Sequence, residues 1–86
     1  MNNGYKIYSM RDRLADNFRN VFLDVSDAVA RRNFTYAVNN SPELAFQSKD
    51  LELVCLGEFN DHTGAILCYP AYTIVCRGDE VMTDGK

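Results

Sequence analysis

The sequence predicts a small α+β domain in which one amphipathic helix packs on one face of an antiparallel sheet of four to five strands, in the chain order β-β-α-β-β. Three patterns predict this fold: extended-type segments before residue 26, a helical apolar period after it, and two further extended segments around a glycine-containing turn. The 86 residues suffice for one domain only. We expect a single domain over 1–86, with an ordered core over about residues 5–77 and a polar C-terminal tail over 78–86.

The first two predicted strands cover residues 5–11 and 18–25. Both are rich in aromatic and branched side chains, and in the second Val21, Leu23 and Val25 fall on one side. The polar residues between the two strands are predicted to form a loop.

The most regular pattern is the apolar period over residues 27–39, which predicts an amphipathic helix. Ser26 is a suitable N-cap, and Asp27 lies at the positive end of the helix dipole. Pro42 cannot continue the helix, which therefore ends just before it. The apolar stripe consists of Ala30, Phe34, Ala37 and Val38, and the polar arc opposite consists of Arg31, Arg32, Thr35 and Asn39.

After a loop or short turn over 43–49, residues 50–59 alternate as in a strand. One side carries Leu51, Leu53, Cys55 and Phe59, and the other carries Glu52, Val54, Leu56 and Glu58. Val54 and Leu56 need apolar cover that a single helix on the opposite face does not supply. We therefore expect a homodimer that forms through sheet faces or edges.

A hairpin follows this strand. Residues 60–64 are predicted to form its loop, which Gly64 can close in the left-handed conformation. Residues 65–69 return as the partner strand. Pro70 interrupts the ladder of hydrogen bonds, so 72–76 are expected to form a separate edge strand.

Composition excludes several classes of protein. Hydrophobic residues make up 47% of the chain and charged residues 24%, which is an ordinary globular ratio and argues against intrinsic disorder. The longest apolar run is 65–69, far short of the roughly 20 residues that span a bilayer. The N-terminus lacks the basic start and apolar block of a signal peptide, so we expect the protein to stay where it is made.

The three cysteines and the single histidine form no recognisable metal motif. Cys55, Cys68 and Cys76 lie in strand patterns without a Cys-x-x-Cys pair, and a tetrahedral site would need all three together with His62. We expect reduced, unreactive core thiols and neither a metal nor another cofactor.

Catalytic signatures are also missing from the sequence. His62 follows Asp61 in the hairpin loop, where a solvated turn histidine is the simpler interpretation. There is no glycine-rich phosphate loop, no nucleophile motif and no metal-binding carboxylate spacing. We therefore assign no catalytic residue and expect a protein that is not an enzyme.

The charges are unevenly distributed. Residues 1–40 carry six basic and four acidic side chains, and residues 41–86 carry three and eight, which gives net charges of +2 and −5. A basic surface with exposed aromatic rings is typical of nucleic-acid binding. The candidates for that surface are Lys6, Arg11, Arg13, Arg19, Arg31, Arg32 and Tyr36, and other rings that could stack on bases are Tyr5, Tyr8, Phe46, Tyr69 and Tyr72.

An alternative interpretation of these residues stays open. The arginines can form a solvated face paired with Asp12, Asp16 and Asp27, and most of the rings can belong to the core or its rim. The low isoelectric point, near 4.9, favours this alternative over a strongly basic binding surface.

Four segments stand out in a fixed order along the chain: Tyr5-Lys6-Ile7-Tyr8-Ser9-Met10-Arg11-Asp12, Val21-Phe22, the helix end Ala37-Val38-Asn39-Asn40, and Leu56-Gly57-Glu58-Phe59-Asn60-Asp61-His62-Thr63-Gly64. This set resembles the small nonstructural protein of gokushovirus-type microviruses, which are bacteriophages with single-stranded DNA genomes. The similarity covers about residues 5–68, and the hairpin is its most specific part. A proline that commonly precedes the paired aromatics is absent here, as is a His-Pro before the third strand.

The resemblance implies a non-enzymatic phage protein that is accessory to viral DNA replication, binds single-stranded DNA and acts in the host bacterial cytoplasm. Its matched residues Gly57, Asp61, Thr63 and Gly64 look like hairpin architecture rather than a binding site. The alternative is a protein-interaction module that acts on the phage replication initiator or a host replication protein without touching DNA. The acidic second half of the chain suits that alternative.

Overall fold

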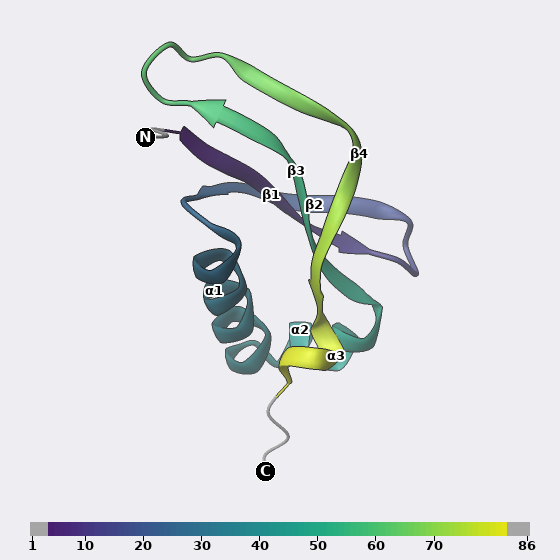
Figure 1. Cartoon of the computed structure of the whole chain (residues 1–86). Coiled ribbons are helices and arrows are strands. Elements are labelled where there is room, and N and C mark those ends of the chain that lie inside the picture. Colours follow the sequence, from purple (N-terminus) through teal and green to yellow (C-terminus); the bar gives the residue numbers. More distant parts are fainter. Residues whose placement is uncertain (1–3, 83–86) are drawn as a thin grey trace.

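The computed structural model describes residues 4–82 and contains a four-stranded antiparallel sheet with helices on one side (Figure 1). The elements are β1 (Gly4–Asp12), β2 (Asn17–Asp24), α1 (Asp27–Asn40), α2 (Pro42–Gln47), the 3-10 turn η1 (Ser48–Asp50), β3 (Leu51–Asn60), β4 (Ile66–Arg77) and α3 (Gly78–Val81). The strand order across the sheet is β2-β1-β3-β4. The predicted α+β class is therefore confirmed, with four strands.

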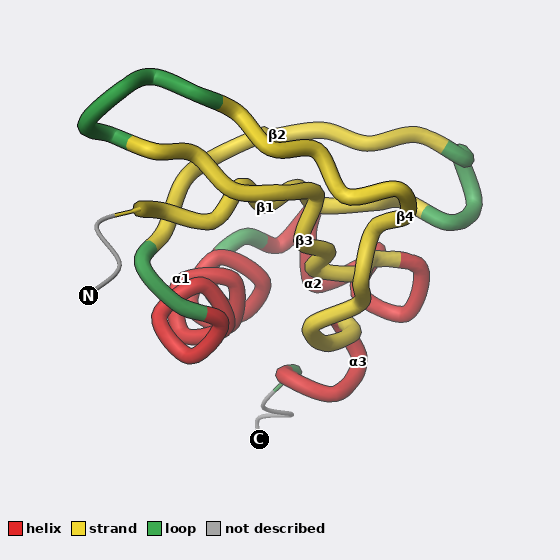
Figure 2. Tube along the Cα trace, turned by 45° about the horizontal axis from the view of Figure 1, so that its top comes forward, coloured by secondary structure: helices red, strands yellow, loops and turns green. Residues whose placement is uncertain are grey.

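The core lies between the sheet and α1. Figure 2 shows α1, α2 and α3 on the same side of the sheet. Tyr8 and Met10 of β1 pack there with Ala30, Phe34 and Val38 of α1. The other buried members of this cluster are Leu51, Leu53, Cys55, Cys76 and Val81. Three residues of the predicted apolar stripe are thus buried, as the helical period indicated.

Both ends of α1 follow from local sequence. The Ser26 hydroxyl accepts a hydrogen bond from the Val29 N–H and caps the first turn, as predicted. At the other end Ser41 caps a second helix, α2, in which Pro42 occupies the first turn. A loop or short turn was expected over 43–49; the short helix α2 and the 3-10 turn η1 occupy that segment, so a loop there is wrong.

The strand β4 runs unbroken from Ile66 to Arg77, so the expected division at Pro70 into two strands is wrong. Pairing is nevertheless interrupted at the proline. Gly57 pairs with Cys68 and Cys55 with Thr73, so four residues of β4 bulge out opposite one residue of β3. A proline without an N–H fits in this bulge on an edge strand at no cost in ladder hydrogen bonds.

The hairpin between β3 and β4 has the predicted form. The Asn60 N–H donates to the Ala65 carbonyl, and Gly64 has a φ of +81°, in the left-handed region.

The segment after β4 differs from expectation. Residues 78–81 form α3, and Val81 is buried against the core, so the polar tail does not begin at residue 78. The rest of the expected tail, residues 83–86, lies outside the described residues.

We call the side of the sheet opposite α1 the open face. Residues that are directly paired across two strands lie on the same face of a sheet. The pairs on the open face are Ile7–Leu23, Arg11–Phe18, Val54–Ile74 and Phe59–Ile66. On this face the Phe18 and Tyr72 rings, from the two edge strands, meet edge to face at 5.5 Å between centroids. Val54 is fully buried, so the expectation that this residue lacks cover within one chain is wrong.

Candidate nucleic-acid interface

The seven residues predicted from sequence do not form one surface. Arg11, Arg13 and Arg19 lie around the turn between β1 and β2, whereas Arg31 and Arg32 lie on α1. The remaining two, Lys6 and Tyr36, lie on β1 and α1. The candidate interface therefore divides into a turn cluster and a helix surface.

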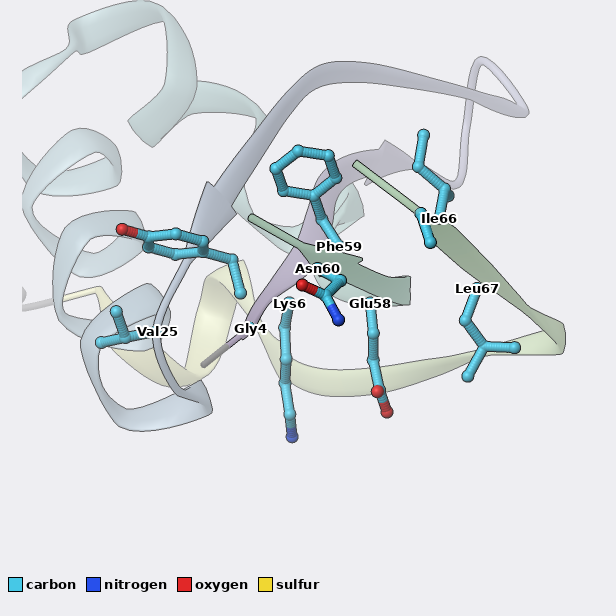
Figure 3. Close-up of a pocket in the computed structure, with 10 residues that line it drawn as sticks. Gly4, Lys6, Val25, Glu58, Phe59, Asn60, Ile66 and Leu67 are labelled. Carbon is cyan, nitrogen blue, oxygen red and sulfur yellow. The ribbon is translucent and has the colours of Figure 1, made fainter. Parts of the chain in front are cut away.

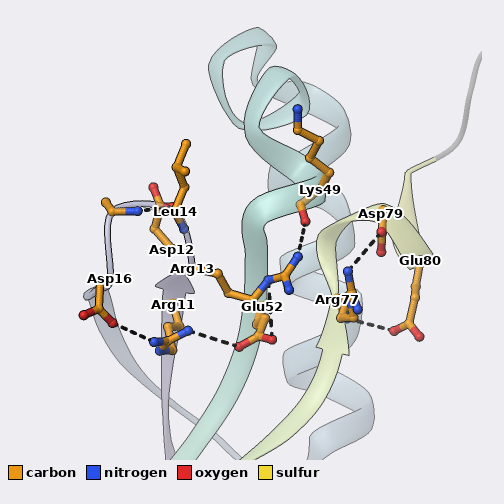
Figure 4. A network of polar contacts seen from close by, with 11 residues as sticks. Arg11, Asp12, Arg13, Leu14, Asp16, Lys49, Glu52, Arg77, Asp79 and Glu80 are labelled. Atoms are coloured by element: carbon orange, nitrogen blue, oxygen red, sulfur yellow. Dashed lines mark hydrogen bonds and ion pairs between the residues drawn. The ribbon is translucent and has the colours of Figure 1, made fainter.

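In the turn cluster Arg11 is held from several sides (Figure 4). Its Nη2 lies 2.8 Å from Asp16 Oδ1, and its Nη1 lies 3.8 Å from Glu52 Oε1. Its guanidinium also lies 5.6 Å from the centroids of both the Phe18 and the Tyr72 rings. These contacts neutralise the charge and fix the side chain against the open face.

Arg13 and Arg19 are also occupied. Arg13 Nε lies 3.8 Å from Glu52 Oε2, and its Nη2 donates to the Lys49 carbonyl at 2.8 Å. Arg19 Nη2 donates to Asp12 Oδ2 at 3.1 Å and to Gln47 Oε1 at 2.8 Å. The paired interpretation of the sequence thus holds for these arginines, although the carboxylates include Glu52, which the sequence did not indicate.

Lys6 belongs to a small network beside the core. Its Nζ lies 3.7 Å from Asp27 Oδ1, which also accepts a 2.7 Å hydrogen bond from the Tyr8 hydroxyl. Burial, and then the bond to Asp27, raise the pKa of Tyr8 well above its ordinary value. Tyr8 is fully buried, so its ring cannot stack on a base.

The helix surface is different. Arg31 and Arg32 are exposed, and within residues 4–82 no carboxylate lies within ion-pair distance of either guanidinium. Tyr36 is 70% exposed and lies four residues after Arg32, on the same side of the helix. We call Arg31, Arg32 and Tyr36 the α1 surface.

The predicted polar arc of α1 is only partly solvent-facing. Asn39 is half-buried, and its Nδ2 donates to the Thr35 and Val81 carbonyls at 2.8 Å each. This residue therefore ties α1 to α3 instead of joining the exposed surface. Lys49, on η1, is a further exposed cation without an ion-pair partner in the described part of the chain. The sequence did not single out Lys49. Which cations lack an ion-pair partner becomes visible only when tertiary contacts show which of them have one.

The other rings named from the sequence are scattered. Phe46 is the most exposed large apolar side chain of the structure and lies on α2. The Tyr69 hydroxyl donates to Glu58 Oε2 at 2.9 Å, and this bond, followed by burial, raises the pKa of Tyr69 to about 12. Tyr5 and Tyr72 lie on β1 and β4. None of them joins the α1 surface.

The cysteines correct another expectation. Cys55 and Cys76 are buried, and burial raises the pKa of both thiols, which keeps them in the unreactive protonated form. Cys68 is exposed, so it is not a core residue.

Among residues 4–82 no three His, Cys, Asp or Glu side chains gather as a metal site. His62 lies at the exposed hairpin tip, where its backbone N–H donates to Asn60 Oδ1.

A shallow cleft of about 410 Å³ opens at the end of the sheet where β1, β3 and β4 meet (Figure 3). Phe59 and Ile66 point to one side of the sheet there, and Lys6, Glu58 and Leu67 point to the other. Its charged lining residues are Lys6 and Glu58, which are paired across β1 and β3.

No helix within the described range is long and apolar enough to cross a membrane. Neither curated proteins nor solved structures gave a match to the chain. The comparison with protein families gave a match: residues 5–81 match the family described as Phage ORF5 protein. The match spans the whole fold from β1 to α3, so the chain belongs to the phage ORF5 protein family.

Proposed function

We propose that this phage protein is a non-enzymatic accessory of viral DNA replication that binds single-stranded DNA in the host bacterial cytoplasm. The DNA would lie along the α1 surface, where Arg31 and Arg32 contact phosphates and Tyr36 offers a ring for base stacking. The similarity of residues 5–68 to the nonstructural protein of gokushovirus-type microviruses supports this role, because such phages must produce single-stranded genomes.

One observation carries the choice of surface. Lys6, Arg11, Arg13 and Arg19 already have carboxylates within 4 Å, so a phosphate would have to displace an internal partner. The guanidinium groups of α1 have no such competitor within residues 4–82. Arg32, beside the exposed Tyr36, and Arg31, about 100° further round the helix from Arg32, can take up phosphate without losing an internal ion pair.

The test compares variants that change the net charge equally. Arg32→Ala and Lys49→Ala each remove one exposed cation without an internal ion pair, but only the first lies on the α1 surface. We expect Arg32→Ala to weaken binding of a fluorescent oligo-dT more than Lys49→Ala at the same salt concentration. Equal losses would show that only net charge matters, and no binding by the parent chain would refute the proposal.

A second function has its own observation. Several large apolar side chains are exposed, among them Leu14 and Phe46 on either side of a 350 Å³ cleft between the β1–β2 turn and α2. Such a pair suits a protein partner, as expected for a module that binds a replication initiator without contacting DNA. This alternative predicts that changes on the α1 surface leave replication unaffected, whereas Phe46→Ala impairs it.

A further inference from the structure

No helix covers the open face. Its exposed apolar side chains lie on the edge strands β2 and β4, whereas Ser9 and Val54 between them are fully buried. Helices cover only the other side of the sheet, and the chain is a slab of 43 × 25 × 16 Å (Figure 2). Small domains are normally built from two packed layers, each of which buries the apolar side of the other. A sheet side without such cover is the natural place for a partner.

The exposed apolar area on this face falls within the range of the largest patch on a typical monomer, which is often a functional surface. Five large side chains keep 38–62% of their surface exposed: Phe18, Leu23, Ile66, Tyr72 and Ile74. At about 150–250 Å² for a whole large side chain, this leaves roughly 500 Å² of apolar surface. The largest patch on a typical monomer covers about 300–600 Å², and each half of a standard interface about 800 Å².

The charges of this face point to the occupant. Arg11 and Glu52, which lie on it, are paired with each other and with Asp16 and Arg13. Arg77 pairs with Asp79 beside them. A face whose charges are satisfied internally can meet a copy of itself without like-charge repulsion, although the chain carries a net charge of −3.

We propose that a second copy of this chain packs on the open face, related to the first by a two-fold axis. A homodimer was also expected from the sequence, with Val54 in the contact. In the dimer proposed here the contact is made by Leu23, Ile66 and Ile74 instead. Since α1 lies on the other side of the sheet, the α1 surfaces of both chains remain on the outside of the dimer (Figure 2).

The experiment is analytical ultracentrifugation of the full chain and three lysine variants. Leu23→Lys on β2 and Ile74→Lys on β4 place a charge on the open face, whereas Phe46→Lys places the same charge on an 87% exposed side chain outside it. We expect the parent and Phe46→Lys to dimerise alike, and each face variant to raise the dissociation constant at least about tenfold. Because all three positions are exposed in the monomer, circular dichroism should show folded chains throughout.

A native thiol gives a second readout. Cys68 pairs with Gly57, which pairs with Ile7, so its side chain lies on the open face. Because the proposed dimer covers the open face, the reaction of Cys68 with a thiol reagent should become slower as the concentration of the parent chain rises. In the Ile74→Lys variant the rate should not depend on protein concentration. A parent that stays monomeric at the highest concentration tested, or a Phe46→Lys variant that dissociates as readily as the face variants, would overturn the proposal. Either result leaves the DNA test on α1 untouched.

Discussion

Gly57 is the residue at which the strand pairing of this fold can be tested most sharply. It lies on β3, between β1 and β4, and a Cβ atom there would meet the Leu67 carbonyl oxygen at 2.1 Å and the Cys68 Cα at 3.2 Å. Both are backbone atoms, so no side-chain rotation relieves the clash. Gly57→Ala must therefore push β4 away from β3 by more than about 1 Å, which breaks one or two hydrogen bonds worth about 1 kcal/mol each.

With the strain of overpacking, the expected loss is about 2–4 kcal/mol of the free energy of unfolding. This is a large share of the total for a domain of this size and lowers the melting temperature by at least about 8 °C. Urea unfolding and thermal melts followed by circular dichroism measure both quantities. Gly64→Ala is the matched control, because nothing lies within 4 Å of its added Cβ and only the φ of +81° opposes it. A Gly57→Ala variant no less stable than Gly64→Ala would refute the pairing of β3 with β4.

Two further predictions concern titratable groups. In native, dilute protein one thiol per chain, that of Cys68, should react with a thiol reagent and the other two only after unfolding; three native reactive thiols would contradict the core placement. Because the bond to Glu58 raises the pKa of Tyr69 from 10.0 to about 12, its contribution to stability is complete below pH 10 and is lost as the pH rises to 12. Unfolding free energies measured over that range should fall less steeply in Tyr69→Phe than in the parent, and an equally steep fall would count against the bond.

The sequence allowed the regular elements to be predicted because their signals are local. The helix follows from an apolar period and a serine cap, and the observed α1 ends one residue beyond the expected 39. The short helices α2 and α3 were not predicted, for two different reasons. The start of α2 is marked by Ser41 and Pro42, which also mark the end of α1, so one signal served two helices. The helix α3 is held by the burial of Val81 against the core, which no local pattern reveals.

The candidate site was predictable only as a set of residues. Whether each arginine is free depends on strand register: Glu52 reaches Arg11 and Arg13 because β3 lies beside β1. Nothing in the spacing of these residues indicates that contact. Arg31 and Arg32 could be placed on the outside of α1 from the helical period alone. The same reasoning explains Cys68, which lies on the open face of β4, whereas Cys76 of the same strand pairs with Leu53 on the core side.

The central claim, that the α1 surface binds the phosphates of single-stranded DNA, is tested most directly by the salt dependence of binding. The parent chain and the Arg31→Ala, Arg32→Ala double variant would be titrated with a fluorescent oligo-dT over a range of salt concentrations. Two lost phosphate contacts should lower the magnitude of the log–log slope by about 1.4, since each contributes about 0.7 for single strands. The melting temperature should stay unchanged, because both side chains are exposed. The same slope and affinity in parent and variant, or no binding by the parent near physiological salt, would contradict the claim.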